Sequence, residues 1–342
     1  DSALIFQLLK KFLADSNNKF LSILSLIAAL LCGTQVKAQQ VPPTTSDSVA
    51  TVFFIKNITP ENLVKIYDAL DRRAKGKVCV KISTGEKGNP NYLKPALIGD
   101  LVKGLHATIV ECNTAYPGAR EFDTEHCQVI IDHGFSSIAP VVILDSTGET
   151  SLPVLHGNRI KQAYVGKDWL NYDFTIVLSH FKGHAMAGFG GALKNMGIGL
   201  QCRNGKAWVH SAANSTNPED LWEKGYKWPA QEDWLEVMTE AAGAVMDHAG
   251  NNILYINVAN NISVDCDCSS HPSPAQISDI GIFASLDPVA LDRACIDAVN
   301  NSPEHGKVHM QERIASRKGT HTLDYAEQIG LGTQKYVLIV IE

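Results

Sequence analysis

The sequence predicts an α/β fold in which a single domain holds a mostly parallel sheet flanked by helices. Short, continuous apolar runs such as residues 174–178 are typical of strands that are buried on both faces. These runs alternate with segments of helical periodicity, which is the rhythm of βαβ units. Because the chain shows no internal repeat and no clean break, we expect one domain at 50–342, with an insertion at about 201–229.

Each strand is predicted from an apolar run and each helix from the periodicity that follows it. In the first half, strands are expected at 51–56, 78–82, 107–111, 141–144 and 174–178, and helices at 61–73, 95–103 and 120–132. In the second half, helices are expected at 231–248 and 287–299, and strands at 253–258, 280–284 and 336–341. The helix at 287 has a clear start, with Asp287 as its cap and Pro288 in its first turn.

The N-terminal 38 residues have the pattern of a secretory signal peptide. Three lysines precede the apolar run 20–32, and Ala38 supplies the small residue expected before a cleavage point. Residues 39–49 form a linker that contains Pro, Ser and Thr. We therefore expect a periplasmic or secreted protein that keeps no stable membrane span after cleavage.

Composition narrows the choice of partners. The 342 residues are 45% hydrophobic and carry a net charge of −6. Loss of residues 1–38, with four lysines and two aspartates, would make this charge about −8. Nucleic acid is therefore excluded as a partner. Composition does not determine the oligomeric state.

Residues 180–199, HFKGHAMAGFGGALKNMGIG, are the strongest candidate for a site. They follow the strand at 174–178, and open α/β sheets bind ligands at the carboxyl ends of their strands. His180 and His184 would lie on one face of a helix or converge from a loop at Gly183, as metal ligands or acid–base groups. The alternative is that these histidines bond to the backbone or pack inward. With Lys194 they form the predicted catalytic set.

Positive charge and glycine in this segment favour a small anionic ligand. Lys182 and Lys194 are predicted to clamp the anion, while residues at other strand ends contribute carboxylates that act as bases or hard ligands. For these strand-end residues, a loop or cap hydrogen bond is the alternative. The full predicted ligand-binding set is Lys81, Glu86, Glu111, Lys182, Gly188, Gly190, Gly191 and Asn195. The segment lacks a complete GxGxxG or P-loop pattern, so it does not predict nucleotide binding.

A second cluster, DCDCSSH, begins at Asp265. Cys266 and Cys268 would project to the same side of an extended segment and, with His271, form half of a soft-metal site. Free thiols, or a disulfide to a distant cysteine, are the alternatives. Asp265 and Asp267 would disfavour thiolates here, so the thiols are expected to stay protonated unless a cation is present.

Several segments together resemble the domain-of-unknown-function family 362 (DUF362), whose members are labelled uncharacterised iron-sulfur centre proteins. The resemblance extends from about residue 51 to the C-terminus and includes the sequences at 178–195, 251–268, 279–300 and 319–332. Many family members carry a ferredoxin-like module with CxxCxxC runs. None occurs among the eight cysteines of this chain, so a divalent metal ion, or no metal, is favoured over an iron-sulfur cluster.

A shorter stretch is similar to the amino-terminal domain of nickel-dependent lactate racemase. In that protein a histidine is followed ten residues later by the lysine that bears the nickel pincer cofactor, and His184 and Lys194 have this spacing. The resemblance implies a shared ligand site but not racemisation. The sequence thus favours a redox or metal-dependent enzyme that acts on small anionic substrates. The alternative is a cofactor-binding or electron-transfer accessory protein without catalysis.

Overall fold

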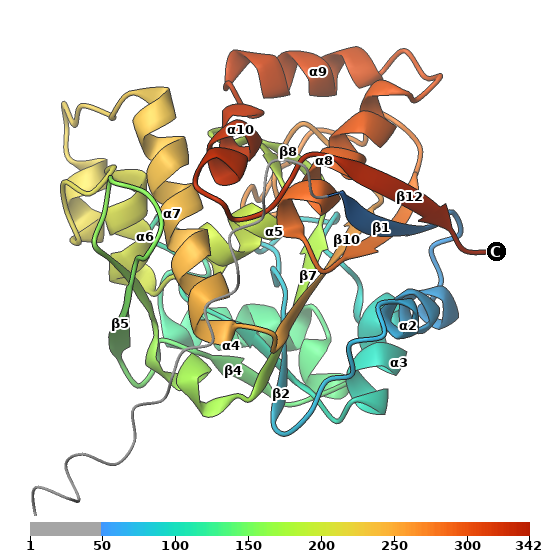
Figure 1. Ribbon diagram of the computed structural model, residues 1–342. Helices are drawn as coiled ribbons and strands as arrows, with labels where there is room; N and C mark the ends of the chain where they lie inside the picture. Colours follow the sequence, from blue (N-terminus) through green and yellow to red (C-terminus); the bar gives the residue numbers. More distant parts are fainter. Residues whose placement is uncertain (1–48) are drawn as a thin grey trace, which may run out of the picture. The chain divides into compact units, whose positions relative to one another are not determined.

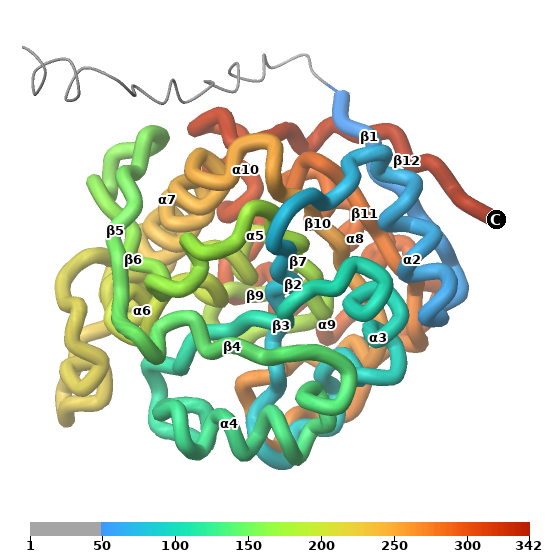
Figure 2. The backbone as a smooth tube through the Cα atoms, turned by 90° about the horizontal axis from the view of Figure 1, so that it is seen from below, coloured from blue at the N-terminus to red at the C-terminus, as the bar shows by residue number. Residues whose placement is uncertain are grey.

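An eight-stranded sheet lies at the centre of the computed structural model, which describes residues 49–342. The strand order is β12-β1-β11-β10-β7-β2-β3-β4, so β12 and β4 form the edges (Figure 2). The strands are β1 (Ala50–Ile55), β2 (Val78–Lys81), β3 (Thr108–Glu111), β4 (Val141–Ile143), β7 (Phe174–His180), β10 (Ile253–Ala259), β11 (Gly281–Ser285) and β12 (Tyr336–Val340). The predicted α/β class with a mostly parallel sheet is confirmed.

One strand, β11, is antiparallel to its neighbours β1 and β10, while all other pairs in the sheet are parallel. The chain passes from β10 to β11 through residues 260–280, which contain no helix. A parallel neighbour requires a crossover, usually a helix, whereas an antiparallel neighbour needs only a loop. The missing helix therefore accounts for the reversed strand.

Helices cover both faces of the sheet (Figure 1). Along β10, Ile253 and Tyr255 pack with residues of α7 and α8, while Leu254 and Ile256 pack with residues of α2 and α3. This alternation explains why the strands are continuous apolar runs. The helices are α2 (Pro60–Ala69), α3 (Pro95–Gly104), α4 (Asp123–Asp132), α5 (Ala192–Lys194), α6 (Arg203–His210), α7 (Gln231–Ala249), α8 (Pro288–Asn300), α9 (Lys307–Ser316) and α10 (His321–Gln328).

Two small hairpins complete the fold. One is β5 (Glu149–Pro153) with β6 (Gln162–Gly166), and the other is β8 (Lys182–His184) with β9 (Gly188–Gly190). Helix α9 packs against the β8–β9 hairpin (Figure 1). The helical arrangement expected for His180 and His184 is wrong, because the first ends β7 and the second ends β8, with no helix between them.

Several element bounds differ from the prediction. Helix α2 ends at Ala69 rather than at residue 73, and α4 begins at Asp123 rather than at residue 120. The expected insertion at 201–229 contains α6, which packs on α7, and the 3₁₀ turn Pro218–Trp222. The prediction missed the hairpin β5–β6 and helices α9 and α10. Lone periodic segments of this length are hard to distinguish from loops.

The predicted signal peptide and almost all of the linker lie outside the described residues. Within residues 49–342, no helix combines the length and the apolar composition needed to cross a bilayer.

Candidate functional site

A cavity of about 560 Å³ opens at the carboxyl ends of β2, β3 and β7, where the fold class predicts a ligand site. The predicted residues that line it are Lys81, Glu111, His180, Lys182, His184, Gly190, Gly191, Lys194, Asn195, Cys266 and Cys268. Residues that were not predicted also line it, and they include Tyr116, Arg120, Lys206, His210, Trp222 and Trp228. We call this cavity the strand-end cleft.

Three predicted residues lie outside the lining. Glu86 is buried behind it, where its carboxylate accepts hydrogen bonds from Tyr116 Oη (3.1 Å) and from the backbone N–H of Ala119 (2.9 Å). Gly188 packs its backbone against α9, with Ile314 Cα only 3.0 Å from where a Cβ would stand. His271 is exposed and does not join the two cysteines, because the chain turns away after Cys268.

Opposite charges are paired on the β2–β3 side of the strand-end cleft. Glu111 bonds to Lys81 Nζ and to Arg120 Nη1, each at 3.2 Å, and its second oxygen also accepts from Thr84. Burial alone would raise the pKa of Glu111, but Lys81 and Arg120 hold it well below its usual range. Glu111 is therefore an anion committed to protein partners. Arg120 was predicted to begin a helix; instead it lies in the loop before α4.

Asn195 also forms its hydrogen bonds with residues at the strand ends. Its Nδ2 donates to the carbonyls of Lys81 and Leu178 and to Ser179 Oγ, while its Oδ1 accepts from Lys81 Nζ. The side chain ties β2 to β7. Its position in the lining therefore serves to fix the geometry of the cleft floor.

His180 and Lys182 converge on Asp267. His180 Nδ1 lies 2.8 Å from Asp267 Oδ1, and Lys182 Nζ lies 2.7 Å from Oδ2. His180 Nε2 is 2.6 Å from the carbonyl of Asn260. Both partners of the ring are acceptors, so both ring nitrogens donate and the ring is an imidazolium. Neither nitrogen is left for a metal ion, and His180 acts by anchoring Asp267.

This anchor corrects the prediction about the thiols. Burial would raise the pKa of Asp267, but His180 and Lys182 hold it well below its usual range. The charge of the carboxylate is thus balanced by His180 and Lys182. Asp265 pairs with Arg313 at 3.4 Å. Neither aspartate therefore opposes a thiolate in the way the sequence indicates.

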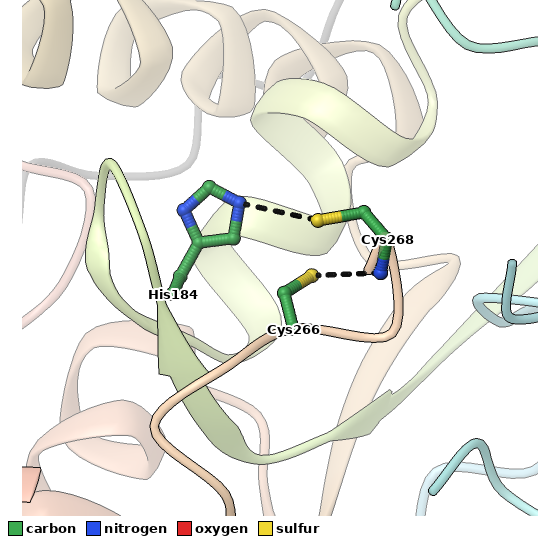
Figure 3. Close-up of side chains that lie close together, drawn as sticks. All are labelled: His184, Cys266 and Cys268. Atoms are coloured by element: carbon green, nitrogen blue, oxygen red, sulfur yellow. Dashed lines mark hydrogen bonds between the residues drawn. The ribbon is translucent and has the colours of Figure 1, made fainter. Parts of the chain in front are cut away.

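The two cysteines occupy a tight turn. The N–H of Ser269 donates to the carbonyl of Cys266 at 3.0 Å, which closes the turn with Cys268 in its third position. Asn89 Nδ2 holds the same turn through the carbonyls of Cys266 (3.3 Å) and Ser269 (2.7 Å). The backbone N–H of Cys268 also points to Cys266 Sγ at 3.4 Å. Both sulfurs therefore face one side, toward His184 (Figure 3).

Hairpin β8–β9 brings His184 to this turn because Gly183 permits close backbone contact. Gly183 N–H donates to the carbonyl of Ser263 at 2.7 Å, and a Cβ on Gly183 would stand 2.4 Å from the carbonyl oxygen of Val264. Any larger residue would push the hairpin away from the cysteine loop. Glycine is therefore required here for packing.

His184 points one nitrogen at the hairpin and the other at the sulfurs. Its Nδ1 accepts the backbone N–H groups of Met186 (3.1 Å) and Ala187 (2.9 Å), so the proton of the neutral ring lies on Nε2. Nε2 lies 3.9 Å from Cys268 Sγ (Figure 3). Burial, with help from Lys194, lowers the pKa of His184 to about 4. At neutral pH the ring is an uncharged N–H donor facing the thiols.

The thiols of Cys266 and Cys268 differ in pKa. The hydrogen bond from the Cys268 thiol lowers the pKa of Cys266 well below its usual value, and Lys194, His184 and Lys182 add to this against the effect of burial. The same hydrogen bond and burial raise the pKa of Cys268. The two thiols therefore differ in acidity, with the pKa of Cys266 below the ordinary value and that of Cys268 above it.

The sequence predicts that the glycine-rich segment offers backbone amides to an external anion, but two amides beside Gly191 are already bonded within the protein. The backbone N–H groups of Ala192 and Leu193 donate to the carboxylate of Asp292 at 2.8 and 3.0 Å. Gly191 allows this approach, since a Cβ there would stand 2.3 Å from Asp292 Oδ1. The positive end of α5 is thus already satisfied by a residue of the chain itself.

Two ammonium groups in the strand-end cleft have no carboxylate partner. Within residues 49–342, Lys194 forms no hydrogen bond or ion pair. Lys206 Nζ donates only to the carbonyls of Asn113 (2.6 Å) and Gln201 (2.7 Å). Uncompensated cations in a recessed cleft attract anions, because the low dielectric of the walls strengthens their field.

A metal ion fits the thiol cluster only in part. Ligand atoms of His184, Cys266 and Cys268 lie within 4.8 Å of one another. A neutral metal-bound histidine donates its other N–H to an acceptor, whereas Nδ1 of His184 is itself an acceptor. The other five cysteines of residues 49–342 do not join the group. The described residues therefore do not fit a cluster that needs four thiolates, and metal binding by the two sulfurs stays a prediction.

Comparison with known proteins identifies the family. The pattern of the domain of unknown function DUF362 matches residues 78–297, which is more than half of the sequence. This chain belongs to the DUF362 family. The match includes β2, β7, the glycine-rich segment and the cysteine turn, so the walls of the strand-end cleft are family sequence.

Other similarities to this DUF362 protein are remote. No curated protein matches it in sequence. Among solved structures, the lactate racemase apoprotein from Thermoanaerobacterium thermosaccharolyticum matches with a TM-score of 0.37 and 13% identity, over 61% of this chain and 51% of that chain. The chain spans about half the length of that protein. A likeness at this level carries no argument about function.

Proposed function

We propose that the strand-end cleft binds a small organic anion and that the protein acts on this ligand as an enzyme. The observation that carries the proposal is Lys194, whose ammonium lines the cleft without a partner among the described residues. A buried or half-buried cation costs free energy unless an anion compensates it. A bound carboxylate or phosphate would supply this compensation.

The surroundings of Lys194 support an anion rather than a cation. Among the described residues that line the cleft, Glu111 is the only carboxylate, and it is already paired with Lys81 and Arg120. No carboxylate is therefore free to attract a cation in this part of the structure. Lys206 adds a second positive charge on the cleft wall.

The rim of the strand-end cleft supports an organic ligand rather than a bare inorganic ion. Trp222 and Trp228 line the cleft while remaining 49% and 45% exposed, and their rings lie 6.2 Å apart. Aromatic side chains of this kind give apolar contact area to a ligand with a carbon skeleton. The cavity volume of about 560 Å³ lies within the range of small-molecule sites.

The thiolate of Cys266 supports catalysis over simple binding. Its sulfur lines the same cleft as Lys194, and the backbone N–H of Cys268 points to it at 3.4 Å. A thiolate is a nucleophile and a base, and both roles require access to the ligand. A non-catalytic carrier would need no such group. The N-terminal signal pattern supports a periplasmic or secreted place of action.

Isothermal titration calorimetry would test the binding step with a panel of small monocarboxylates, dicarboxylates and phosphate esters. We expect one class to bind, and Lys194→Met to weaken its binding at least about tenfold, because a charge-assisted hydrogen bond is lost. Lys103→Met, which changes an exposed lysine of α3, is the matched control.

The outcomes separate the alternatives. Equal affinity of the Lys194→Met and Lys103→Met variants would refute the anion site. If the ligand binds but mass spectrometry detects no conversion of it over hours, the result would favour the non-catalytic accessory protein instead.

A further inference from the structure

We propose that Cys266 and Cys268 are a redox-active dithiol that exchanges with low-molecular-weight disulfides and closes to an intramolecular disulfide. This activity differs from anion binding, and it depends on the thiol cluster alone. The supporting features are the cysteine turn, the donors around it and its place in the wall of the strand-end cleft.

The turn places the two sulfurs within reach of each other. Both belong to a group whose ligand atoms all lie within 4.8 Å, and the backbone N–H of Cys268 already points to Cys266 Sγ. A disulfide needs an S–S distance of about 2.0 Å, which rotation about the Cα–Cβ bonds in one turn can supply. Closure therefore requires no movement of sheet or helices.

The surroundings assign different roles to the two sulfurs. Cys266 lines the cleft together with Lys182 and Lys194, and nearby positive charge favours a thiolate, so we assign Cys266 as the attacking sulfur. Cys268, whose sulfur lies within 4.8 Å of that of Cys266, is then the resolving sulfur. The N–H of His184 at 3.9 Å from Cys268 can stabilise negative charge when this second thiol ionises.

The exchange balances in two steps. The Cys266 thiolate attacks one sulfur of a disulfide R–S–S–R, which forms a Cys266–S–S–R bond and releases R–S⁻. Cys268 then gives up its proton to the released thiolate and attacks Cys266 Sγ, which forms the Cys266–Cys268 bond and releases the second thiolate, which takes up a proton from water. Counting the proton that Cys266 released when its thiolate formed, the dithiol loses two electrons and two protons, and the disulfide becomes two R–SH.

The other described cysteines lack this combination. Cys79, Cys112, Cys202 and Cys295 are buried, and burial raises the pKa of each thiol. Cys127 is exposed on α4, and its pKa is also raised. Since Cys127 is accessible, it could react without any special site and has to be removed from the experiment.

The test uses the full chain with Cys127→Ser, reduced and then incubated with oxidised glutathione. Free thiols are blocked with iodoacetamide and peptides are mapped by mass spectrometry. We expect a disulfide between Cys266 and Cys268, reversed by reduced glutathione. Adding Cys268→Ser should leave glutathione attached to Cys266, and adding Cys266→Ser should slow attachment at the cluster about tenfold or more.

Two results would overturn the proposal. One is that Cys266 and Cys268 of the Cys127→Ser protein both remain free thiols in oxidised glutathione. The other is that a stoichiometric metal ion, found by elemental analysis, protects them until a chelator removes it. Because the Cys127→Ser protein retains the whole cleft, these results do not depend on how the cluster variants fold. Anion binding is measured with Cys266 and Cys268 reduced. A failure of anion binding is therefore distinguishable from a failure of the dithiol proposal.

Discussion

Lys182 Nζ lies 2.7 Å from Asp267 Oδ2, although 85 residues separate the two in sequence. This contact joins hairpin β8–β9 to the cysteine turn, since Asp267 stands between Cys266 and Cys268. The same carboxylate bonds to His180 at the end of β7. One buried anion therefore fixes three segments that form the cleft.

Asp267→Asn is expected to lower the free energy of unfolding by about 3–5 kcal/mol, because it leaves two buried cations, His180 and Lys182, without their counter-ion. Asp265→Asn is the control two residues away. Its partner Arg313 is partly exposed, so we expect a loss of about 1 kcal/mol. Urea unfolding followed by fluorescence would measure both. Similar losses in the two variants would contradict the anchoring role of Asp267.

Alkylation of Cys266 by iodoacetamide is expected to remain fast below the pH range of an ordinary thiol. The pKa of Cys266 is lowered, so the reactive thiolate is present at lower pH, and its fraction declines only as pH falls through that lowered value. Lys194→Met should move the rate profile to higher pH, because one stabilising charge is lost. The profile would be measured in the Cys127→Ser background by peptide mass spectrometry, with Lys103→Met as the control; a profile unchanged by Lys194→Met would count against this electrostatic role.

The ring of His184 is expected to stay uncharged from pH 5 to pH 8. Its pKa is lowered to about 4, so protonation begins only as pH approaches that value. Nuclear magnetic resonance of the imidazole groups would show constant His184 shifts over this range and the proton on Nε2. Comparison with His184→Gln would identify the signals. A midpoint near 6.5 would show that the ring is solvated and not held as described.

Gly191→Ala is expected to destabilise the protein by about 1–3 kcal/mol, since its Cβ would stand 2.3 Å from Asp292 Oδ1. Gly190→Ala is the matched control. Its Cβ would meet only Lys194 Cδ at 3.6 Å and Lys182 Cε at 3.7 Å, which is ordinary contact. Thermal unfolding of the two variants should therefore differ clearly. Equal midpoints would show that Asp292 can move aside.

The local sequence pattern was sufficient to predict most of the strands and helices. Apolar runs predicted the strands of the central sheet, because strands buried on both faces, such as β7 and β10, carry mostly apolar side chains. Asp287 and Pro288 predicted the start of α8, and the Asp287 side chain does accept from Val289 and Ala290. The reversed strand β11 was not predictable in this way, since a strand's composition does not encode its direction.

The sequence by itself determined where the cleft lies and most of the predicted residues that line it, because the carboxyl ends of parallel strands meet at one edge of a sheet. Only the tertiary structure decided their charges and partners. Asp267 bonds to His180 and Lys182. Asp292 accepts a backbone N–H group of the glycine-rich segment, which the sequence predicted would bind an external anion. These contacts join residues 85 to 100 positions apart, and electrostatic effects depend on distance in space rather than on distance along the chain.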